Sequence, residues 1–192
     1  MFTFEIFTVF FIGLIFGSFA NVCIARLPKD KTIIFGRSNC PKCKKKISWY
    51  DNIPLISFIL LKGKCRQCNK KISINYFFVE LITGIFFILT YLYTNNYFDF
   101  VLINLILILF LIIFFIDLKH FIIPDILNFS LIFLGLLKNF IPTKNLNFNY
   151  DIEQSIIGGV VGYLTIWIII FLYKKLKNLD AMGLGDAKLM AA

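Results

Sequence analysis

Four of the five cysteines in this 192-residue chain form two Cys-x2-Cys pairs. Cys40 and Cys43 make the first pair, 21 residues follow, and Cys65 and Cys68 make the second. Each pair can hold a tetrahedral metal ion from one tight turn, and two pairs complete a site with four thiolate ligands. Because four thiolates leave no open coordination position, we expect a structural Zn²⁺ ion rather than a hydrolytic one.

Disulfide bonds, redox chemistry at one pair and unmetallated thiols are the alternatives for these cysteines. A cytoplasmic location, argued below, favours metal because the cytoplasm keeps thiols reduced. The surrounding lysines are compatible with nucleic-acid binding, but contacts with anionic lipid headgroups explain them more simply. We therefore expect membrane lipid and no nucleic acid as a partner. The fifth cysteine, Cys23, lies in an apolar stretch and is expected to be a small buried hydrophobe.

Two aspartates could carry hydrolytic chemistry. Asp117 ends a very apolar stretch, and Asp186 follows Gly183-Leu184-Gly185. Acidic side chains near a bilayer are costly and usually functional. Two carboxylates that share one proton can activate water, since one removes a proton while the other protonates the leaving group. The simpler interpretation is that each aspartate only flanks a helix end.

Other titratable residues compete for these roles. Asp125, preceded by a proline, is an alternative to Asp117, and Asp180 is an alternative to Asp186, although its polar surroundings favour a solvated surface position. His120 is the only histidine. It could relay protons, but a surface position at the membrane interface is the simpler interpretation.

Long apolar helices must position these residues. The chain is 59% hydrophobic and 16% charged, whereas soluble proteins carry about a quarter charged residues. Its mean hydropathy is +0.81. The apolar runs are long enough to cross about 30 Å of hydrocarbon as helices. We predict membrane spans at Phe2–Ile24, Tyr76–Thr94, Phe98–Leu118, Phe121–Ile141 and Gln154–Tyr173, with a further helix beginning near Asp186.

The first run is interpreted as a retained span rather than a secretory signal, because its start carries Glu5 instead of basic residues. Gly13-x-x-x-Gly17 in this span and Gly158-x-x-x-Gly162 in the last are weak signals of close helix packing. The predicted fold class is an all-α polytopic membrane protein, a helical bundle with a zinc-knuckle loop between the first two spans. We divide the chain into a first span (1–24), a zinc-binding region (25–75) and a membrane domain (76–192).

The basic residues predict the orientation of the chain. Residues 25–75 hold 13 of the 20 Lys and Arg, so this loop should face the cytoplasm and the N-terminus should lie outside. The same orientation places Asp117 and Asp186 at the cytoplasmic ends of their helices. A helical bundle could therefore bring the two carboxylates together at that face.

Several segments, in this order, resemble the bacterial type IV prepilin peptidases. The segments are Gly17-Ser18-Phe19-Ala20-Asn21-Val22 with Arg26-Leu27-Pro28, the two cysteine pairs enclosing Trp49-Tyr50-Asp51-Asn52-Ile53-Pro54, Val79-Glu80-Leu81-Ile82-Thr83-Gly84, Ile116-Asp117-Leu118, Pro124-Asp125 and Gly183-Leu184-Gly185-Asp186-Ala187-Lys188. The resemblance covers nearly the whole chain, and the segments are specific in combination.

The resemblance implies a bifunctional enzyme of the bacterial inner membrane. Such peptidases remove the basic leader of type IV prepilins or pseudopilins at the cytoplasmic face, after a glycine. They then N-methylate the new terminal residue, commonly Phe, with S-adenosylmethionine. By this resemblance Asp117 and Asp186 are the aspartyl pair of a Gly-x-Gly-Asp protease, and the four cysteines form a zinc knuckle in the region associated with methylation. Residues that bind S-adenosylmethionine are not identified.

One departure from the family pattern concerns the C-terminus. The family continues past Gly-x-Gly-Asp with further transmembrane helices, whereas six residues follow Asp186 here. We therefore expect a truncated chain with a poorly positioned Asp186 and weak activity. A catalytically inactive adaptor that docks partners through its zinc knuckle is one alternative. A small transporter with Asp117 in a proton path is another, disfavoured because both acids lie at one membrane face.

Overall fold

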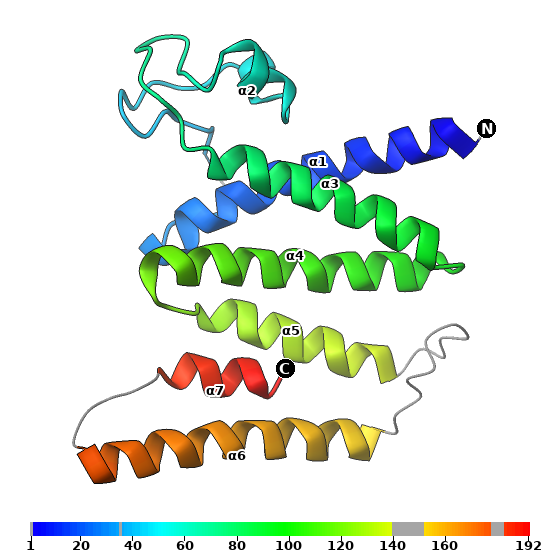
Figure 1. Cartoon of the computed structure of the whole chain (residues 1–192), viewed down its shortest axis with the longest axis vertical. Helices are drawn as coiled ribbons and strands as arrows, with labels where there is room; N and C mark the ends of the chain where they lie inside the picture. The colour runs from blue at the N-terminus through cyan, green and yellow to red at the C-terminus, as the bar shows by residue number, and fades with distance from the viewer. Residues whose placement is uncertain (1, 35, 140–151, 178–182) are drawn as a thin grey trace. The chain divides into compact units, whose positions relative to one another are not determined.

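The structure is a computed structural model that describes residues 2–34, 36–139, 152–177 and 183–192. These residues form helices joined by loops, and within the described ranges the only β pairing is two isolated bridges (Figure 1). The chain divides into two compact units, Met1–Ile112 and Ile113–Ala192. The predicted all-α membrane fold is confirmed.

The first unit contains the cysteine-bearing loop and the helices that flank it. Its elements are α1 (Phe2–Arg26), the short 3-10 helices η1 (Leu27–Lys29) and η2 (Trp49–Asn52), α2 (Ile56–Leu60), α3 (Asn75–Tyr93) and most of α4 (Tyr97–His120). Figure 1 shows the loop with η2 and α2 gathered at one end of the α1–α3 pair.

Glycines allow α1 and α3 to pack closely. A Cβ atom on Gly17 would lie 2.7 Å from the Cα atom of Glu80, and one on Gly13 would lie 2.9 Å from the Cα atom of Gly84. Real Cβ atoms do not approach so near, so the two backbones meet where side chains are absent. Phe16 stacks on Phe87 beside this contact, with ring centroids 5.5 Å apart. The predicted packing role of the Gly13/Gly17 pair is confirmed.

Polar contacts hold the two ends of the same helix pair. Near the start of α1, the Tyr91 hydroxyl donates a hydrogen bond of 2.7 Å to the Glu5 carboxylate. At the other end, the Asn21 side-chain amide donates to the carbonyl of Tyr76 at 3.0 Å. The helices are therefore antiparallel, and the end of α1 is fixed against the start of α3 beside the cysteine-bearing loop.

The second unit contains the last turns of α4, α5 (Asp125–Asn139), α6 (Ile152–Lys177) and α7 (Leu184–Met190). The C-terminal helix α7 packs against α5 and α6. A Cβ on Gly162 would collide with the carbonyl oxygen of Met190, whereas one on Gly158 would meet nothing within 4 Å. Of the predicted Gly158/Gly162 pair, only Gly162 lies at the helix contact.

Four helices are long and apolar enough to cross a membrane among the described residues, and each matches a predicted span. They are Thr3–Lys29, Asn75–Tyr93, Tyr97–His120 and Ile152–Leu176. Many of their large apolar side chains are exposed, as lipid-facing side chains must be. The predicted helix near Asp186 is α7, which begins at Leu184.

The prediction for the span Phe121–Ile141 is wrong at its start. Phe121 adopts a left-handed backbone conformation (φ 54°) just after the end of α4, and α5 begins only at Asp125. Pro124 explains the delay because a proline disfavours helical geometry in the residue before it. The helix has 15 residues, about 22 Å, and is not among the candidate spans. Residues 140–141 lie outside the described ranges.

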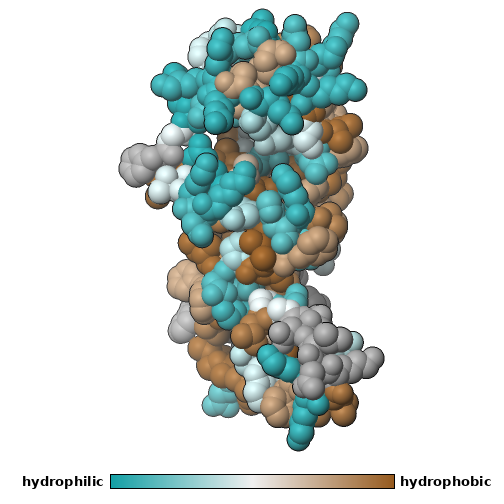
Figure 2. All heavy atoms as spheres, turned by 90° about the vertical axis from the view of Figure 1, so that its left-hand side faces the viewer, coloured by the Kyte–Doolittle hydropathy of each residue, from teal (hydrophilic) through white to brown (hydrophobic). Residues whose placement is uncertain are grey.

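Hydrophilic side chains are concentrated over the cysteine-bearing loop of the first unit. Figure 2 shows them at the top of the view. The loop is the segment that carries 13 of the 20 basic residues. The two Cys-x2-Cys pairs therefore lie in the polar part of their unit.

Candidate functional site

The four predicted metal ligands converge in the first unit. The four Sγ atoms all lie within 4.8 Å of one another; they belong to Cys40, Cys43, Cys65 and Cys68. The Sγ atoms of Cys40 and Cys68 are 3.9 Å apart. Four sulfurs at 2.3 Å from a tetrahedral zinc ion would be separated by about 3.8 Å, so the cluster has nearly the size that zinc requires.

The two pairs form matching turns. In the first, the N–H of Cys40 donates to the carbonyl of Lys45 and the N–H of Lys44 donates back to the carbonyl of Cys40, at 3.0 and 2.9 Å. In the second, the N–H of Cys65 donates to the carbonyl of Lys70 at 3.0 Å, and the N–H of Asn69 donates back to the carbonyl of Cys65 at 2.9 Å. Each turn thereby aims its two sulfurs to one side.

A left-handed residue closes each turn. Lys44 (φ 57°) and Asn69 (φ 52°) occupy the same place, one residue after the second cysteine of their pair. A short sequence repeat underlies the match. Cys-x2-Cys-x-Lys-Lys-Ile-Ser occurs at residues 40–48 and again at 65–73, a signal that spacing of the cysteines alone does not reveal.

The thiols interact strongly with one another. Burial raises the pKa of Cys40, but hydrogen bonds from the backbone of Cys43 and Lys42 and from the thiols of Cys43 and Cys65 bring it down to about 6. A backbone hydrogen bond from Lys70 lowers the pKa of Cys68, but burial and the three other thiols raise it to about 11. The sulfurs are close enough to share protons, and a metal cation would take the place of those protons.

The donor set and its size fit a zinc ion. Four cysteines from two matched turns supply thiolate ligands, and backbone N–H groups around Cys40 stabilise negative charge on sulfur. Such a site is closed, so the ion would supply folding energy to the loop and no catalytic chemistry. No disulfide bond links the cysteines of the described chain.

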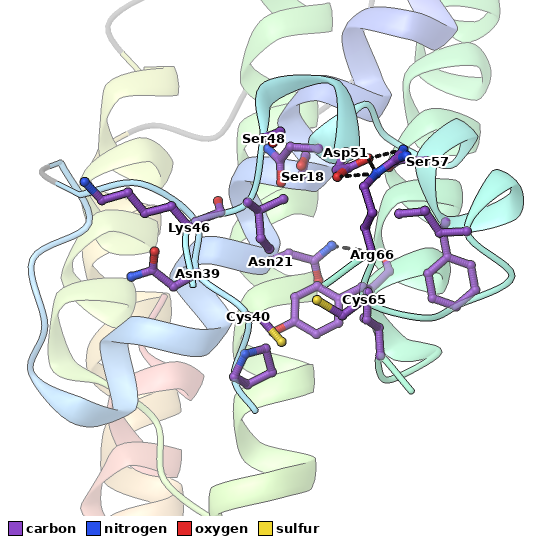
Figure 3. Close-up of a pocket in the computed structure, with 18 of the residues that line it drawn as sticks. Ser18, Asn21, Asn39, Cys40, Lys46, Ser48, Asp51, Ser57, Cys65 and Arg66 are labelled. Atoms are coloured by element: carbon purple, nitrogen blue, oxygen red, sulfur yellow. Dashed lines mark hydrogen bonds and ion pairs between the residues drawn. The ribbon is translucent and has the colours of Figure 1, made fainter. Parts of the chain in front are cut away.

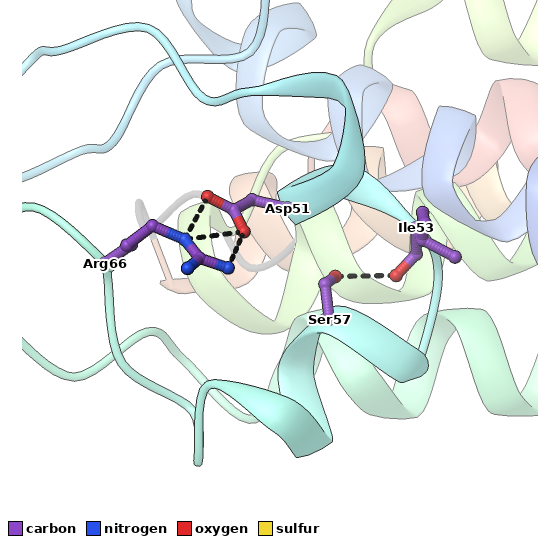
Figure 4. A network of polar contacts seen from close by, with 4 residues as sticks. All are labelled: Asp51, Ile53, Ser57 and Arg66. Atoms are coloured by element: carbon purple, nitrogen blue, oxygen red, sulfur yellow. Dashed lines mark hydrogen bonds and ion pairs between the residues drawn. The ribbon is translucent and has the colours of Figure 1, made fainter.

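An ion pair ties the second cysteine turn to η2. Arg66, between Cys65 and Cys68, donates from Nε to both carboxylate oxygens of Asp51 at 3.0 Å, and a terminal nitrogen reaches one of them at 2.8 Å (Figure 4). The guanidinium also lies 5.4 Å from the centre of the Tyr50 ring. Hydrogen bonding and charge from Asp51 raise the pKa of Arg66.

A cavity of about 200 Å³ adjoins the cysteine cluster (Figure 3). Ser18 and Asn21 of α1 contribute to one wall and Tyr76 and Glu80 of α3 to another. The two cysteine turns contribute Cys40, Cys65 and Arg66 to the lining, and η2 contributes Asp51. Figure 3 shows side chains from these separate segments converging on one space.

Glu80 is the acidic side chain of this cavity that lies within a membrane helix. It is 9% exposed, and its carboxylate accepts a 2.9 Å hydrogen bond from the backbone N–H of Leu55. Leu55 is held at φ 57°, an uncommon conformation for a leucine, immediately before α2. The sequence interpretation gave Glu80 no role, although it is the single charged residue of α3.

The aspartates that were predicted to be catalytic lie in the second unit. Asp117 is exposed in the last turns of α4, and Asp186 is partly buried in the first turn of α7. A Cβ on Gly185 would lie 3.2 Å from the Cβ of Ile123, and Asn128 donates a 3.3 Å hydrogen bond to the Gly185 carbonyl. The Gly-Leu-Gly-Asp segment thus packs against the chain that directly follows α4.

The competing aspartate Asp125 has a different partner. Its carboxylate accepts a 2.6 Å hydrogen bond and ion pair from Lys188, which also lies 6.0 Å from the centre of the Phe129 ring. This contact links α5 to α7 and offsets the negative charge of Asp125. Asp180 lies outside the described residues.

Two further sequence predictions concern single side chains. Cys23 is 4% exposed within α1, as expected for a small buried hydrophobe. His120 is half-buried at the end of α4, and its proposed part in proton transfer stays a prediction.

The fold and the cysteine cluster define a polytopic helical membrane protein with a zinc-type loop. Residues 11–94 match the bacterial peptidase A24 N-terminal domain, and residues 104–192 match the type IV leader peptidase family. The chain therefore belongs to the type IV leader peptidase family.

Relatives named prepilin leader peptidase/N-methyltransferase support this membership. The protein from Vibrio cholerae serotype O1 is 42% identical over 190 residues, covering 94% of this chain and 73% of the relative. The protein from Klebsiella pneumoniae is 38% identical, covering 96% of this chain and 81% of the relative. No solved structure matches the chain.

Proposed function

We propose that this chain is a prepilin leader peptidase that cleaves the leader of type IV prepilins or pseudopilins and N-methylates the new terminal residue. Membership of the type IV leader peptidase family and the two activities in its relatives' name support the proposal. The observation that carries the peptidase assignment is the packing of Gly185 against Ile123, because it sets the segment of Asp186 beside the chain that follows Asp117.

Asp117 and Asp186 form the catalytic pair in this proposal. One carboxylate takes a proton from water as the water attacks the peptide carbonyl, and the other protonates the leaving amine. The roles require unlike protonation states, which two neighbouring carboxylates acquire by repulsion of like charge. Asp125 is a poor candidate because Lys188 already neutralises it.

The remaining assignments follow from charge and ligand chemistry. The basic loop faces the cytoplasm, so the N-terminus lies outside and both aspartates work at the cytoplasmic face of the inner membrane. The four cysteines bind a structural zinc ion within the methylation-associated region, residues 25–75, while residues 76–192 carry the peptidase. S-adenosylmethionine is the methyl donor, and the lysines contact lipid headgroups rather than nucleic acid.

Cleavage of a co-expressed prepilin tests the peptidase assignment. Asp117→Asn and Asp186→Asn should each lower the cleavage rate by about 10²–10⁴-fold, because each removes one general acid or base. Asp125→Asn is the matched control and should still cleave, since it loses only an ion pair with Lys188. Loss of cleavage in Asp125→Asn together with normal cleavage in Asp117→Asn would reverse the assignment. Normal cleavage by both Asp117→Asn and Asp186→Asn would refute an aspartyl mechanism.

A further inference from the structure

Helix α2 presents an apolar face to its surroundings. Ile56, Ile59 and Leu60 occupy one side of the helix, at spacings of three and four residues, and are 44%, 63% and 76% exposed. Another side packs inward, where the ring of Phe58 lies 5.5 Å from the ring of Phe77 in α3. A helix in a soluble loop turns its apolar face inward, so the orientation of α2 calls for an apolar partner.

Contacts with α3 fix the depth of α2. The backbone N–H of Leu55, directly before α2, donates a 2.9 Å hydrogen bond to the Glu80 carboxylate. The same carboxylate accepts hydrogen bonds from the side chains of Ser18 and Asn21 in α1. Glu80 lies five residues (80 − 75), about 7.5 Å, into α3, and Phe77 is in the first turn of that helix. Helix α2 is thereby held beside the first two turns of α3 (Figure 1).

The first two turns of α3 lie at the edge of the membrane. This helix has 19 residues, about 28 Å, which only just spans a hydrocarbon layer of about 30 Å. Both of its ends must therefore lie near the boundary between acyl chains and headgroups. An apolar helix face at this level meets lipid, as it does in helices that lie in the membrane interface.

Basic and aromatic side chains around α2 suit an anionic lipid surface. Lys62 and Lys64 come shortly after the helix, and Lys64 lies opposite Lys71 in an isolated antiparallel bridge. Like charges placed opposite one another repel, and lipid phosphates would relieve that repulsion. Trp49 of η2, which packs against α2, is 75% exposed, and tryptophan is enriched at membrane interfaces.

We propose that α2 is an interfacial membrane anchor, whose face of Ile56, Ile59 and Leu60 enters the bilayer where headgroups meet acyl chains. Anionic phospholipid is the partner that this face and the neighbouring lysines fit. Such an anchor goes beyond the headgroup contacts proposed for the lysines, since apolar side chains enter the acyl region, and it requires neither enzymatic activity. It holds the cysteine-bearing loop against the membrane beside α3. A second protein chain that covers the same face is the competing explanation.

Fluorescence quenching by lipid tests the anchor. Trp49→Phe and Trp167→Phe remove the two tryptophans of the chain, and Leu60→Trp then supplies a single probe on the exposed face. The chain is placed in lipid discs of phosphatidylethanolamine and phosphatidylglycerol whose acyl chains carry bromine, a quencher. Lys42→Trp in the same background is the matched control, because this residue is exposed in the lysine-rich first cysteine turn.

The two probes should respond in opposite ways. Leu60→Trp should lose most of its emission to bromine in the upper acyl chain, less to bromine near the chain ends, and little to iodide in the water. Lys42→Trp should be quenched strongly by iodide and little by bromine. Equal bromine quenching at the two positions would overturn the inference, as would a Leu60→Trp signal open to iodide. Emission at position 60 that neither quencher reaches would also overturn it, because protein would then cover the face.

Two further measurements apply if the Leu60→Trp chain does not fold. Ile59→Trp lies on the same face and should show the same bromine quenching, whereas quenching by iodide alone would refute the anchor. A phospholipid with a photoreactive group in its upper acyl chain can also be crosslinked to the unsubstituted chain. Labels within residues 55–61 support the anchor, and labels confined to the four membrane-spanning helices refute it. Neither measurement uses prepilin or S-adenosylmethionine, so failure of the anchor is distinct from failure of the proposed function.

Discussion

The two units of this chain position their functional residues by different means. In the first unit, each cysteine turn is closed by backbone hydrogen bonds within seven residues, so the local chain alone aims the sulfurs. In the second unit, Asp117 and Asp186 are 69 positions apart along the chain (186 − 117). Only helix packing can therefore bring these two carboxylates together. The proposed metal centre should therefore depend on its ion and its turns, and the proposed aspartyl pair should depend on the contacts of α7.

Metal removal should have the largest effect, and only on the first unit. Structural zinc contributes about 10–16 kcal/mol in small zinc-dependent folds, more than packing can replace in a loop without strands. We expect a strong chelator, or Cys40→Ser with Cys65→Ser, to make residues 36–75 sensitive to protease. The metal content should fall from about one zinc per chain, the number that four thiolates in one cluster can hold.

Lower pH should act in the same direction. Protons compete with zinc for the thiolates, so the apparent zinc affinity should fall as the pH falls. A loop that stays protease-resistant after complete removal of the metal would show that the turns alone maintain it. Cys23→Ser is the control, because Cys23 lies in α1 outside the cluster, and it should keep its zinc.

Helix packing in the first unit should give the next largest effect. Gly17→Ala places a Cβ within 2.7 Å of the Glu80 Cα, so α1 and α3 must move apart, which we expect to cost about 1–3 kcal/mol. Gly158→Ala is the matched control because a Cβ there meets nothing within 4 Å. Thermal unfolding in detergent compares the two. Equal midpoints would contradict the close packing of α1 on α3.

The ion pair between Asp51 and Arg66 should have the smallest effect. Arg66 is largely exposed, and solvent weakens exposed pairs. Asp51→Asn should therefore produce only a slight fall in the unfolding temperature of the loop, and added salt should reduce the difference between variant and wild type. A large, salt-independent loss would contradict the small contribution expected of this exposed pair.

Much of the fold could be predicted from the sequence because each membrane helix corresponds to one long apolar run of residues. Four spans and the cysteine cluster were predicted at nearly their observed positions. The start of α5 was missed because apolar composition outweighed the local effect of Pro124. The contact of Glu80 with Leu55 was also missed, since this hydrogen bond and the adjoining cavity join segments that no periodicity relates.

The pairing of Asp117 with Asp186 remains a prediction for the same reason. Carboxylates act as a catalytic pair only at a particular separation and protonation state, and neither is encoded in the residues next to them. The packing of Gly185 against Ile123 supports the pairing without measuring it. Activity measurements must supply that evidence.

The most direct test of the account is the mass of the pilin amino terminus produced by three forms of the chain. The wild-type chain should yield a cleaved, methylated pilin, and Asp186→Asn should leave the leader in place. Cys40→Ser with Cys65→Ser should yield a cleaved pilin that lacks the methyl group, because the proposed catalytic aspartates lie in the other unit. A methylated product from the cysteine variant, or a cleaved product from Asp186→Asn, would contradict the account.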